Sequence, residues 1–430
     1  MINRRSFVRS VLAGSTAVAA SRAAAGRPAL LAQEAFQDGE SYWLHLRWQF
    51  LIPEDQAYFN TGTLGASPRV VVDAVAEHLR YVEESLARWE YGSDTPEKLA
   101  GYRPERGLRQ KIADYVHGDL DEIGLTVNAT MAMNMVANGI DLTPGDEVLI
   151  TDKEHPGGRT GWDLKQKRYG IVVKEVPVPT AVQSPDEIVQ AFSAAMTART
   201  RVLAVPHIIS GPGIILPVKR LCALARERGV FTSIDGAQAV GHLHVNVRDL
   251  GCDAYFSSPH KWLLAPKGNG FLYIRRDAQD RIWTTLASSQ WNNHKDGMFR
   301  LMQWGTLNQS LLRGLEVAID FMNSIGRDRV EQRVRELGSY LRQGLSQIPG
   351  VTVVTPMSPD LSAGITHWGV SGLTGRELQD ELWNRRKIRV RAGGDKVVRQ
   401  STHIYNSRAE VDATVAIATA LAARAPAASR

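Results

Sequence analysis

The fold is decided by FTSIDGAQ at residues 231–238 and by DAYFSSPHKW at residues 253–262. Each stretch contains a short apolar run typical of a buried strand, followed by a reactive side chain, Asp235 in the first and Lys261 in the second. Taken alone, the aspartate reads as a turn or helix cap and the lysine as a solvated side chain. In a doubly wound sheet, however, residues just past the carboxyl ends of adjacent strands converge on one crevice. We therefore expect Asp235 and Lys261 to meet there.

The surrounding sequence supports a parallel α/β sheet. From about residue 143 onward, short apolar runs alternate with amphipathic segments, joined by turns rich in Gly, Pro and Asp. Helices are predicted at residues 186–196 and 218–228. Strands are predicted at residues 147–151, 171–178, 202–205, 230–234, 254–257 and 271–274.

The sequence pattern changes after about residue 311 to long charged segments followed by short apolar runs, which indicates a second, smaller α/β domain. A long charged helix is predicted at residues 327–348, followed by strands at residues 351–355, 365–370 and 387–391. The last helix opens with Ser407 and Glu410 at the spacing of a capping box, in which each side chain satisfies a free backbone amide of the other.

The N-terminus has the character of an export signal. Residues 3–9 read NRRSFVR, a weakly apolar run follows at residues 11–20, and small residues follow at 23–25. This pattern predicts a twin-arginine leader, and the alternative is a disordered basic segment. The first 33 residues carry five Arg and no acidic residue, so without them the formal charge falls by five, from +6 to +1. The basic balance therefore belongs to the leader, and nucleic-acid binding loses its main support.

Cysteine and histidine usage indicates neither a metal centre nor a reactive thiol. The two cysteines, Cys222 and Cys252, fall in a predicted helix and just before a predicted strand, as buried small hydrophobes do. The sequence does not decide whether these two cysteines form a disulfide. The chain has no CxxC or HExxH spacing and its 11 His are scattered, so we expect no structural metal.

Beyond these motifs, the chain resembles the class V aminotransferase family of fold-type I pyridoxal-phosphate (PLP) enzymes, which includes cysteine desulfurases and isopenicillin N epimerase. The resemblance runs from Tyr58 to about Asn406 and is densest over residues 206–275. It implies an α/β fold with a large domain built on a mainly parallel seven-stranded sheet, plus a smaller C-terminal α/β domain. The expected parts are a signal peptide (1–33), a segment packing on the small domain and active site (34–64), a large PLP-binding domain (65–310) and a small domain (311–430).

The resemblance assigns roles to four residues around the cofactor ring. Lys261 resembles the lysine that carries PLP as a Schiff base. Asp235 resembles the carboxylate that pairs with the pyridine nitrogen and keeps it protonated. Gln238 matches the donor to the 3-hydroxyl group. His155 matches the histidine that stacks on the ring, and its alternative is an exposed loop histidine.

The phosphate group of PLP needs hydroxyls, amides and cations, ideally at a helix N-terminus. Thr130 opens an apparent helix, and Ser258 and His260 match the family's other phosphate contacts. Thr306 resembles a residue that reaches the phosphate from a second subunit, which implies a homodimer with shared active sites. Leu307 departs from the family pattern there, and residues 305–306 could instead form an ordinary turn.

The substrate residues implied by the resemblance are two arginines and an asparagine. Arg399 matches the arginine that binds an α-carboxylate, for which a planar guanidinium fork is well suited. Arg391 is a second family-matched arginine nearby. Asn60 matches the N-terminal segment that folds back over the site.

The type of reaction is only partly indicated. Residues 391–399 read RAGGDKVVR and lack the nucleophilic cysteine of desulfurases, and Ser210 stands where desulfurases usually have an asparagine, so we predict that the chain is not a cysteine desulfurase. Transamination, epimerisation and elimination all remain compatible, because they share one carbanion. Transamination needs no residue beyond Lys261 as a proton shuttle and is the favoured reading. A non-catalytic PLP-binding protein is the alternative of another class.

The leader and the fold together suggest a setting for this chemistry. The combination is similar to that of the periplasmic PLP enzyme of pyoverdine siderophore maturation. It implies a periplasmic or secreted enzyme, exported by the twin-arginine machinery, that acts on an amino acid or on a peptide or siderophore amine.

Overall fold

The computed structural model describes residues 39–91 and 98–424. The predicted signal peptide, residues 1–33, lies outside the described residues. Within the described part, no helix is both long enough and apolar enough to cross a membrane.

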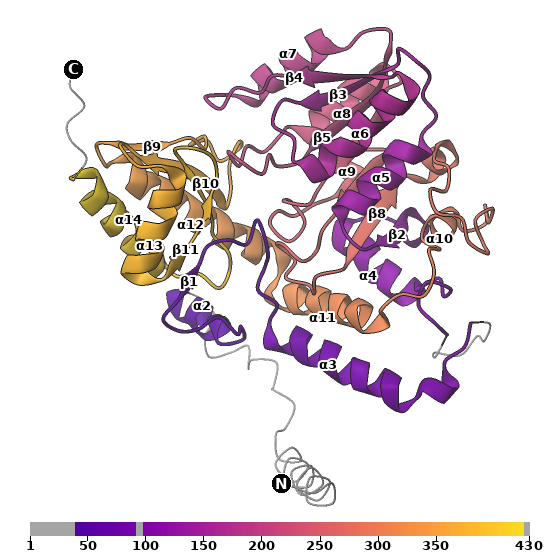
Figure 1. The fold of residues 1–430 in the computed structure, drawn as a ribbon, viewed down its shortest axis with the longest axis horizontal. Coiled ribbons are helices and arrows are strands. Elements are labelled where there is room, and N and C mark those ends of the chain that lie inside the picture. Colours follow the sequence, from indigo (N-terminus) through magenta and orange to yellow (C-terminus); the bar gives the residue numbers. More distant parts are fainter. Residues whose placement is uncertain (1–38, 92–97, 425–430) are drawn as a thin grey trace, which may run out of the picture.

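A seven-stranded sheet forms the centre of the larger part of the chain (Figure 1). Its strand order is β2-β8-β7-β6-β5-β3-β4, and β8 is the strand that runs against its neighbours β2 and β7. The other neighbouring pairs are parallel. This confirms the predicted fold class. The strands are β2 (Ile123–Thr126), β3 (Glu147–Thr151), β4 (Val172–Val176), β5 (Thr200–Pro206), β6 (Phe231–Asp235), β7 (Ala254–Ser257) and β8 (Gly270–Ile274).

Both faces of this sheet are buried, as the doubly wound pattern requires. In β3, Val148 and Ile150 pack in one hydrophobic cluster with Trp162, whereas Leu149 between them packs in the cluster on the opposite face. The first face is covered by α5 (Ala129–Gly139) and α6 (Pro156–Tyr169). Residues of α4 (Arg106–Val116), α7 (Pro185–Ala195), α8 (Val218–Glu227) and α9 (Val247–Leu250) belong to the cluster on the second face.

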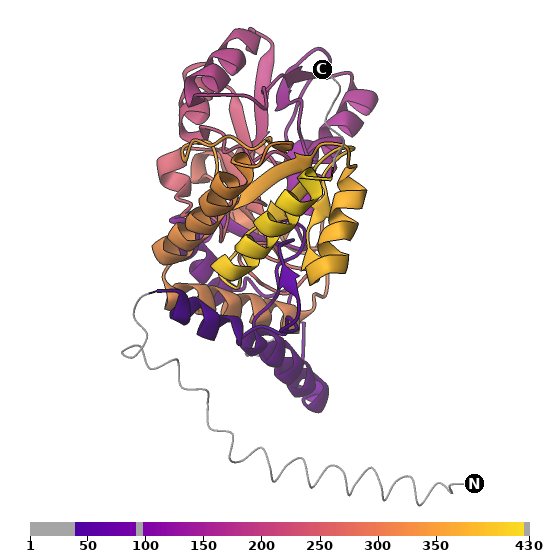
Figure 2. The same ribbon diagram turned by 90° about the vertical axis from the view of Figure 1, so that its left-hand side faces the viewer.

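A smaller antiparallel sheet follows, with the order β12-β13-β10-β9. Figure 2 faces this part and shows the yellow helix α14 lying between α12 and α13. The predicted capping box at the start of α14 is confirmed: Ser407 Oγ accepts from Glu410 N at 3.2 Å, and the Glu410 carboxylate accepts from Ser407 N at 2.9 Å. The elements are β9 (Val351–Val353), β10 (Ile365–Val370), β12 (Arg391–Ala392), β13 (Val398–Ser401), α12 (Arg327–Ser346), α13 (Gly375–Arg386) and α14 (Arg408–Ala422).

The single strand predicted at residues 387–391 is wrong. The chain divides there into β11 (Ile388–Arg389), which pairs with β1 (Ala57–Tyr58), and β12, which pairs with β13. The break lies at Val390, which is fully buried. Two different partners thus divide what reads in sequence as one alternating run.

The N-terminal segment packs against the smaller part. Besides the pairing of β1 with β11, Arg47 of α2 (Glu40–Arg47) donates through Nη1 to the carbonyl oxygen of Tyr405 at 3.0 Å, and Glu40 pairs with Arg333 at 2.8 Å. The next helix, α3 (Arg69–Glu84), lies along α11 (Gln309–Ile325), as Figure 1 shows at its lower edge. The numerical domain boundaries given above stay predictions.

Both cysteines are buried and free, Cys222 within α8 and Cys252 just before β7. The disulfide that the sequence left open is therefore not formed.

Candidate active site

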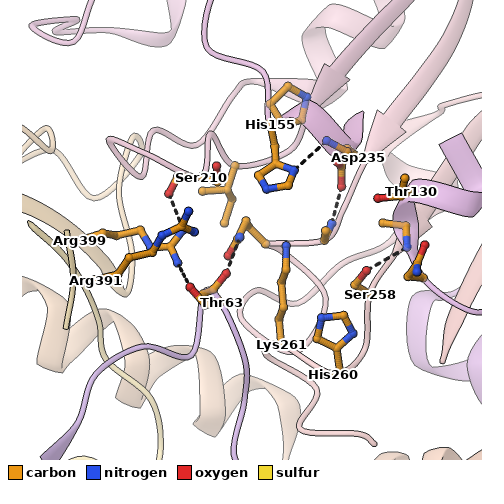
Figure 3. Close-up of a pocket in the computed structure, with 18 residues that line it drawn as sticks. Thr63, Thr130, His155, Ser210, Asp235, Ser258, His260, Lys261, Arg391 and Arg399 are labelled. Carbon is orange, nitrogen blue, oxygen red and sulfur yellow. Dashed lines mark hydrogen bonds between the residues drawn. The ribbon is translucent and has the colours of Figure 1, made fainter. Parts of the chain in front are cut away.

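A cavity of about 260 Å³ lies where several strands of the large sheet end (Figure 3). This volume is just below the usual range for small-molecule sites, about 300–1,000 Å³. Three parts of the chain line it: loops following the sheet strands, the N-terminal segment at Gly62 and Thr63, and β12 and β13 of the small sheet. Among the described lining residues, Asp235 is the one acidic side chain.

Lys261 lies in the turn that follows β7 and projects into this cavity (Figure 3). Its backbone N–H donates to the Ser258 carbonyl at 3.1 Å, and Gly65 N donates to the His260 carbonyl at 2.8 Å. A Cβ at Gly65 would stand 1.9 Å from the Lys261 carbonyl oxygen, so the close approach of the N-terminal segment requires glycine. Burial lowers the pKa of Lys261 to about 8, with Asp235 opposing and Arg399 and Arg391 adding to the effect. A free amine is therefore accessible near neutral pH.

Asp235 ends β6, the strand beside β7, and faces the same cavity. Its Oδ1 accepts from Ala237 N at 2.8 Å, and its Oδ2 has no hydrogen-bond partner among residues 39–91 and 98–424. Burial raises the pKa of Asp235, while the Lys261 charge and the Ala237 bond lower it. A buried carboxylate with an open oxygen is suited to a cationic ring N–H.

His155 caps the N-terminus of α6, and its Nδ1 accepts from Gly157 N at 3.0 Å. With Nδ1 as the acceptor, the proton of a neutral ring is assigned to Nε2. Partial burial lowers the pKa of His155, and the charges of Lys261, Arg391 and Arg399 lower it further. The ring that borders the cavity is therefore a neutral imidazole.

A set of donors at one end of the cavity fits a phosphate group. Thr130 lies in the first turn of α5, where backbone N–H groups are free of helical partners. Ser258 Oγ accepts from Ala129 N at 2.9 Å, which joins the start of α5 to the loop after β7. His260 lines the same region, and its Nδ1 is buried without a partner in the described part of the chain. This unpaired ring nitrogen indicates that a bound group completes the site.

Gln238 is fixed in orientation by two bonds. Its Nε2 donates to the Gly62 carbonyl at 2.9 Å, and its Oε1 accepts from Trp262 Nε1 at 2.7 Å. One N–H of the amide stays available to the cavity, which is compatible with the role of a donor.

The two arginines share one wall of the cavity. Arg391 and Arg399 are directly opposite each other on the antiparallel strands β12 and β13, so their side chains lie on one face. Arg399 is buried and donates to the Ser210 carbonyl at 3.1 Å and to Thr63 Oγ1 at 2.6 Å. Burial, with the Arg391 charge next in importance, lowers the pKa of Arg399 to about 10. The Arg391 side chain makes no hydrogen bond or ion pair with any described residue, so this wall lacks a counter-charge of its own.

Two predicted site residues lie outside the cavity lining. Asn60 is buried, forms a β-bridge with Ser401, and leaves its Oδ1 without a partner among the described residues. Thr306 is exposed, next to Leu307, whose N–H donates to the Ala100 carbonyl at 2.9 Å. Its predicted role concerns a second subunit's cavity and stays a prediction.

Thr63 was not predicted from the sequence, and it holds Arg399 in place on the arginine wall. Thr63 bonds Arg399, and the neighbouring Gly62 bonds Gln238. The available signal was their position directly after Asn60, in the segment expected to fold over the site.

Comparison with known proteins agrees with this geometry. The model of the class V aminotransferase family matches residues 58–415. Two relatives, both named isopenicillin N epimerase, are 34% identical over 397 residues (Amycolatopsis lactamdurans) and 30% identical over 392 residues (Streptomyces clavuligerus). Each alignment covers 86% of this chain and 96% of the relative. A cysteine desulfurase of Pectobacterium atrosepticum is 27% identical over 395 residues, which cover 84% of this chain and 91% of the relative.

Two solved structures share the fold, and one of them contains the PLP cofactor. The cystine C-S lyase C-DES in complex with cysteine persulfide superposes with a TM-score of 0.77 at 25% identity, over 86% of this chain and 98% of the lyase. A C-DES variant with glycine covalently linked to the PLP cofactor gives a TM-score of 0.79 at 26% identity, over 87% and 99% of the two chains. PLP is thus the cofactor that the residues around Lys261 and Asp235 fit, and the chain belongs to the class V aminotransferase family of fold-type I PLP-dependent enzymes.

Proposed function

We propose that this chain is an aminotransferase-type enzyme that moves a proton at the amino-bearing carbon of an amino acid or peptide substrate. The observation that carries the proposal is the position of Lys261, a buried amine with a pKa of about 8, between Asp235 and the arginine wall. A single base of this kind can move a proton between the substrate carbon and a second carbon within its reach.

Each residue then has a separate task. When bound, PLP supplies an electron sink for the substrate carbon. Asp235 holds a proton on the ring nitrogen through its open Oδ2. Thr130, Ser258 and His260 bind the phosphate group and fix the cofactor in place. Lys261 takes up and returns the substrate proton.

Arg399 is the proposed anchor for the substrate carboxylate. Thr63 and Ser210 hold its guanidinium in one orientation, and its buried Nε has no partner among the described residues. A carboxylate bound there also supplies the counter-charge that the Arg391–Arg399 wall lacks.

The chain is proposed not to be a cysteine desulfurase, although several relatives carry that name. The cavity-side segment 391–399 contains no cysteine. Burial raises the pKa of Cys222 to about 12 and raises the pKa of Cys252 well above its usual value. Neither thiol therefore supplies a thiolate nucleophile near neutral pH.

Epimerisation is the second candidate, favoured by the two relatives named isopenicillin N epimerase. The structure also brings His155, a neutral imidazole, to the cavity that holds Lys261. Two acid–base groups at one cavity are what an exchange of protons between opposite faces of a carbon needs.

The proposed setting is the periplasm or cell exterior, reached by twin-arginine export, with a homodimer as the active unit. The support for export is the NRRSFVR sequence at residues 3–9, and the support for a homodimer is the resemblance of Thr306 to a residue that reaches the phosphate of a second subunit. Replacing Arg4 and Arg5 with Lys is expected to keep the protein in the cytoplasmic fraction. Equal export of this variant and the wild type would remove the support for twin-arginine transport.

A single incubation in D₂O separates the candidate reactions. The holoenzyme is mixed with a panel of amino acids and a glutamate-bearing peptide, and products are analysed by chiral chromatography and mass spectrometry. Transamination predicts a 2-oxo product and the matching loss of the visible cofactor band. Deuterated substrate of both configurations, without an oxo product, would establish epimerisation and reject transamination. The K261A variant, which lacks the base, is the control and is expected to show neither.

A further inference from the structure

A second carboxyl group lies near Asp235 but outside the cavity lining, in the loop between β3 and α6. Glu154 follows Thr151, the last residue of β3, and directly precedes His155, the cap of α6. Its Oε1 accepts two bonds from Thr151, from the backbone N at 3.1 Å and from Oγ1 at 2.8 Å. These bonds close the turn that delivers His155 to the cavity.

The free oxygens of Glu154 and Asp235 face the same small space. A Cβ built on Gly158 would stand 2.9 Å from Asp235 Oδ2 and 3.7 Å from Glu154 Oε2. Gly158 itself is buried in the first turn of α6, so the absence of a side chain there lets this helix approach Asp235. Glu154 Oε2, like Asp235 Oδ2, has no hydrogen-bond partner among the described residues.

Two carboxyl groups in one poorly solvated space do not both ionise readily. Burial raises the pKa of Glu154 to about 8, and the Asp235 charge adds to this, whereas the Thr151 bonds and Arg159 oppose it. Arg159 is already paired with Asp163 at 2.9 Å and Glu175 at 2.5 Å, so its charge does little to stabilise an ionised Glu154. The Lys261 charge lowers the pKa of Asp235 and so favours its ionised form. An ionised Asp235 in turn favours the protonated form of Glu154.

We propose that Glu154 is a positioning residue of the cofactor site, an uncharged carboxyl anchored on Thr151 that holds the start of α6 against Asp235. Asp235 is then left as the single negative charge for the pyridine nitrogen. The inference depends on the PLP site and not on the reaction, so a failed transaminase assay leaves it intact. Among the described residues, the charged or titratable groups that interact with this pair are Arg159 with Glu154, and Lys261 and Tyr255 with Asp235. His155 directly follows Glu154 in the chain.

The first test is the melting temperature of the PLP-free protein as a function of pH. A carboxyl whose pKa rises on folding favours the folded state below its unfolded pKa, and this contribution is lost as pH rises through the folded value. The melting temperature of E154Q relative to wild type is therefore expected to increase between pH 5 and pH 8 and to level off above that. The exposed glutamate at the end of α8 gives the control E227Q, whose difference from wild type is expected to stay flat. A flat difference for E154Q would overturn the proposal.

The second test is PLP affinity at pH 7, measured by titrating the PLP-free proteins. E154Q keeps an oxygen acceptor for Thr151 and is expected to bind PLP within about two-fold of wild type. E154A loses that anchor, and a net hydrogen bond of about 1 kcal/mol corresponds to about five-fold weaker binding. Wild-type affinity in a folded E154A would overturn the positioning role, and strongly weakened binding in E154Q would overturn the uncharged state.

Discussion

Replacing Asp235 with Asn is expected to weaken PLP binding without destabilising the PLP-free protein. The variant keeps an Oδ1 that accepts from Ala237 N, so the local turn is preserved. It removes the charge that faces the ring nitrogen. A hydrogen bond to a charged group contributes about 1.5–3 kcal/mol, and about 1.4 kcal/mol corresponds to a ten-fold change, so the Kd for PLP is expected to rise about 10- to 150-fold.

Without PLP, the same change is expected to leave the melting temperature unchanged or raised, because burial disfavours the charged form of Asp235. The pKa of Lys261 is expected to fall further below about 8, since Asp235 is the group that raises it. The assays are a PLP titration followed by visible absorption and thermal melts of the PLP-free proteins. An unchanged Kd in D235N would refute the pairing of Asp235 with the ring nitrogen.

Three further results are expected. The R399K variant cannot keep both bonds of the guanidinium fork and should raise KM for the amino substrate about 10- to 100-fold. The R391K variant changes an exposed side chain without a partner among the described residues and should change KM less than about five-fold. Equal effects of the two variants would contradict the assignment of Arg399 as the carboxylate anchor. The rate of covalent PLP attachment to the PLP-free protein should increase with pH through a midpoint near 8, because the deprotonated Lys261 amine is the nucleophile, and a midpoint above 10 would contradict its lowered pKa. The double variant C222S/C252S should release no less sulfur from cysteine than the wild type, and loss of a wild-type desulfurase activity in it would overturn the exclusion of that reaction.

The large sheet and its two central residues could be predicted because their signals are local. Asp235 and Lys261 each follow a short apolar strand, and neighbouring parallel strands bring such positions to one edge. The strand β2, by contrast, did not stand out among the predicted strands, because it lies before the alternating pattern begins and pairs with β8 from a distant part of the chain.

The rest of the site depends on contacts between distant segments. Thr63 bonds Arg399 because β1 of the N-terminal segment pairs with β11. No sequence pattern near residue 63 predicts that pairing. The run at residues 387–391 alternates like one strand, and only its two separate partners divide it. Glu154 reads in sequence as a solvated loop residue, whereas its environment comes from β6 and the close approach of Gly158.

The most direct test of the central claim is to locate the lysine that carries PLP. The holoenzyme is reduced with sodium borohydride, digested with a protease and analysed by mass spectrometry. The peptide containing Lys261 is expected to carry the added pyridoxyl-phosphate mass. A label on a different lysine, such as the nearby Lys267, or no label on a holoenzyme that shows the visible cofactor band, would contradict it.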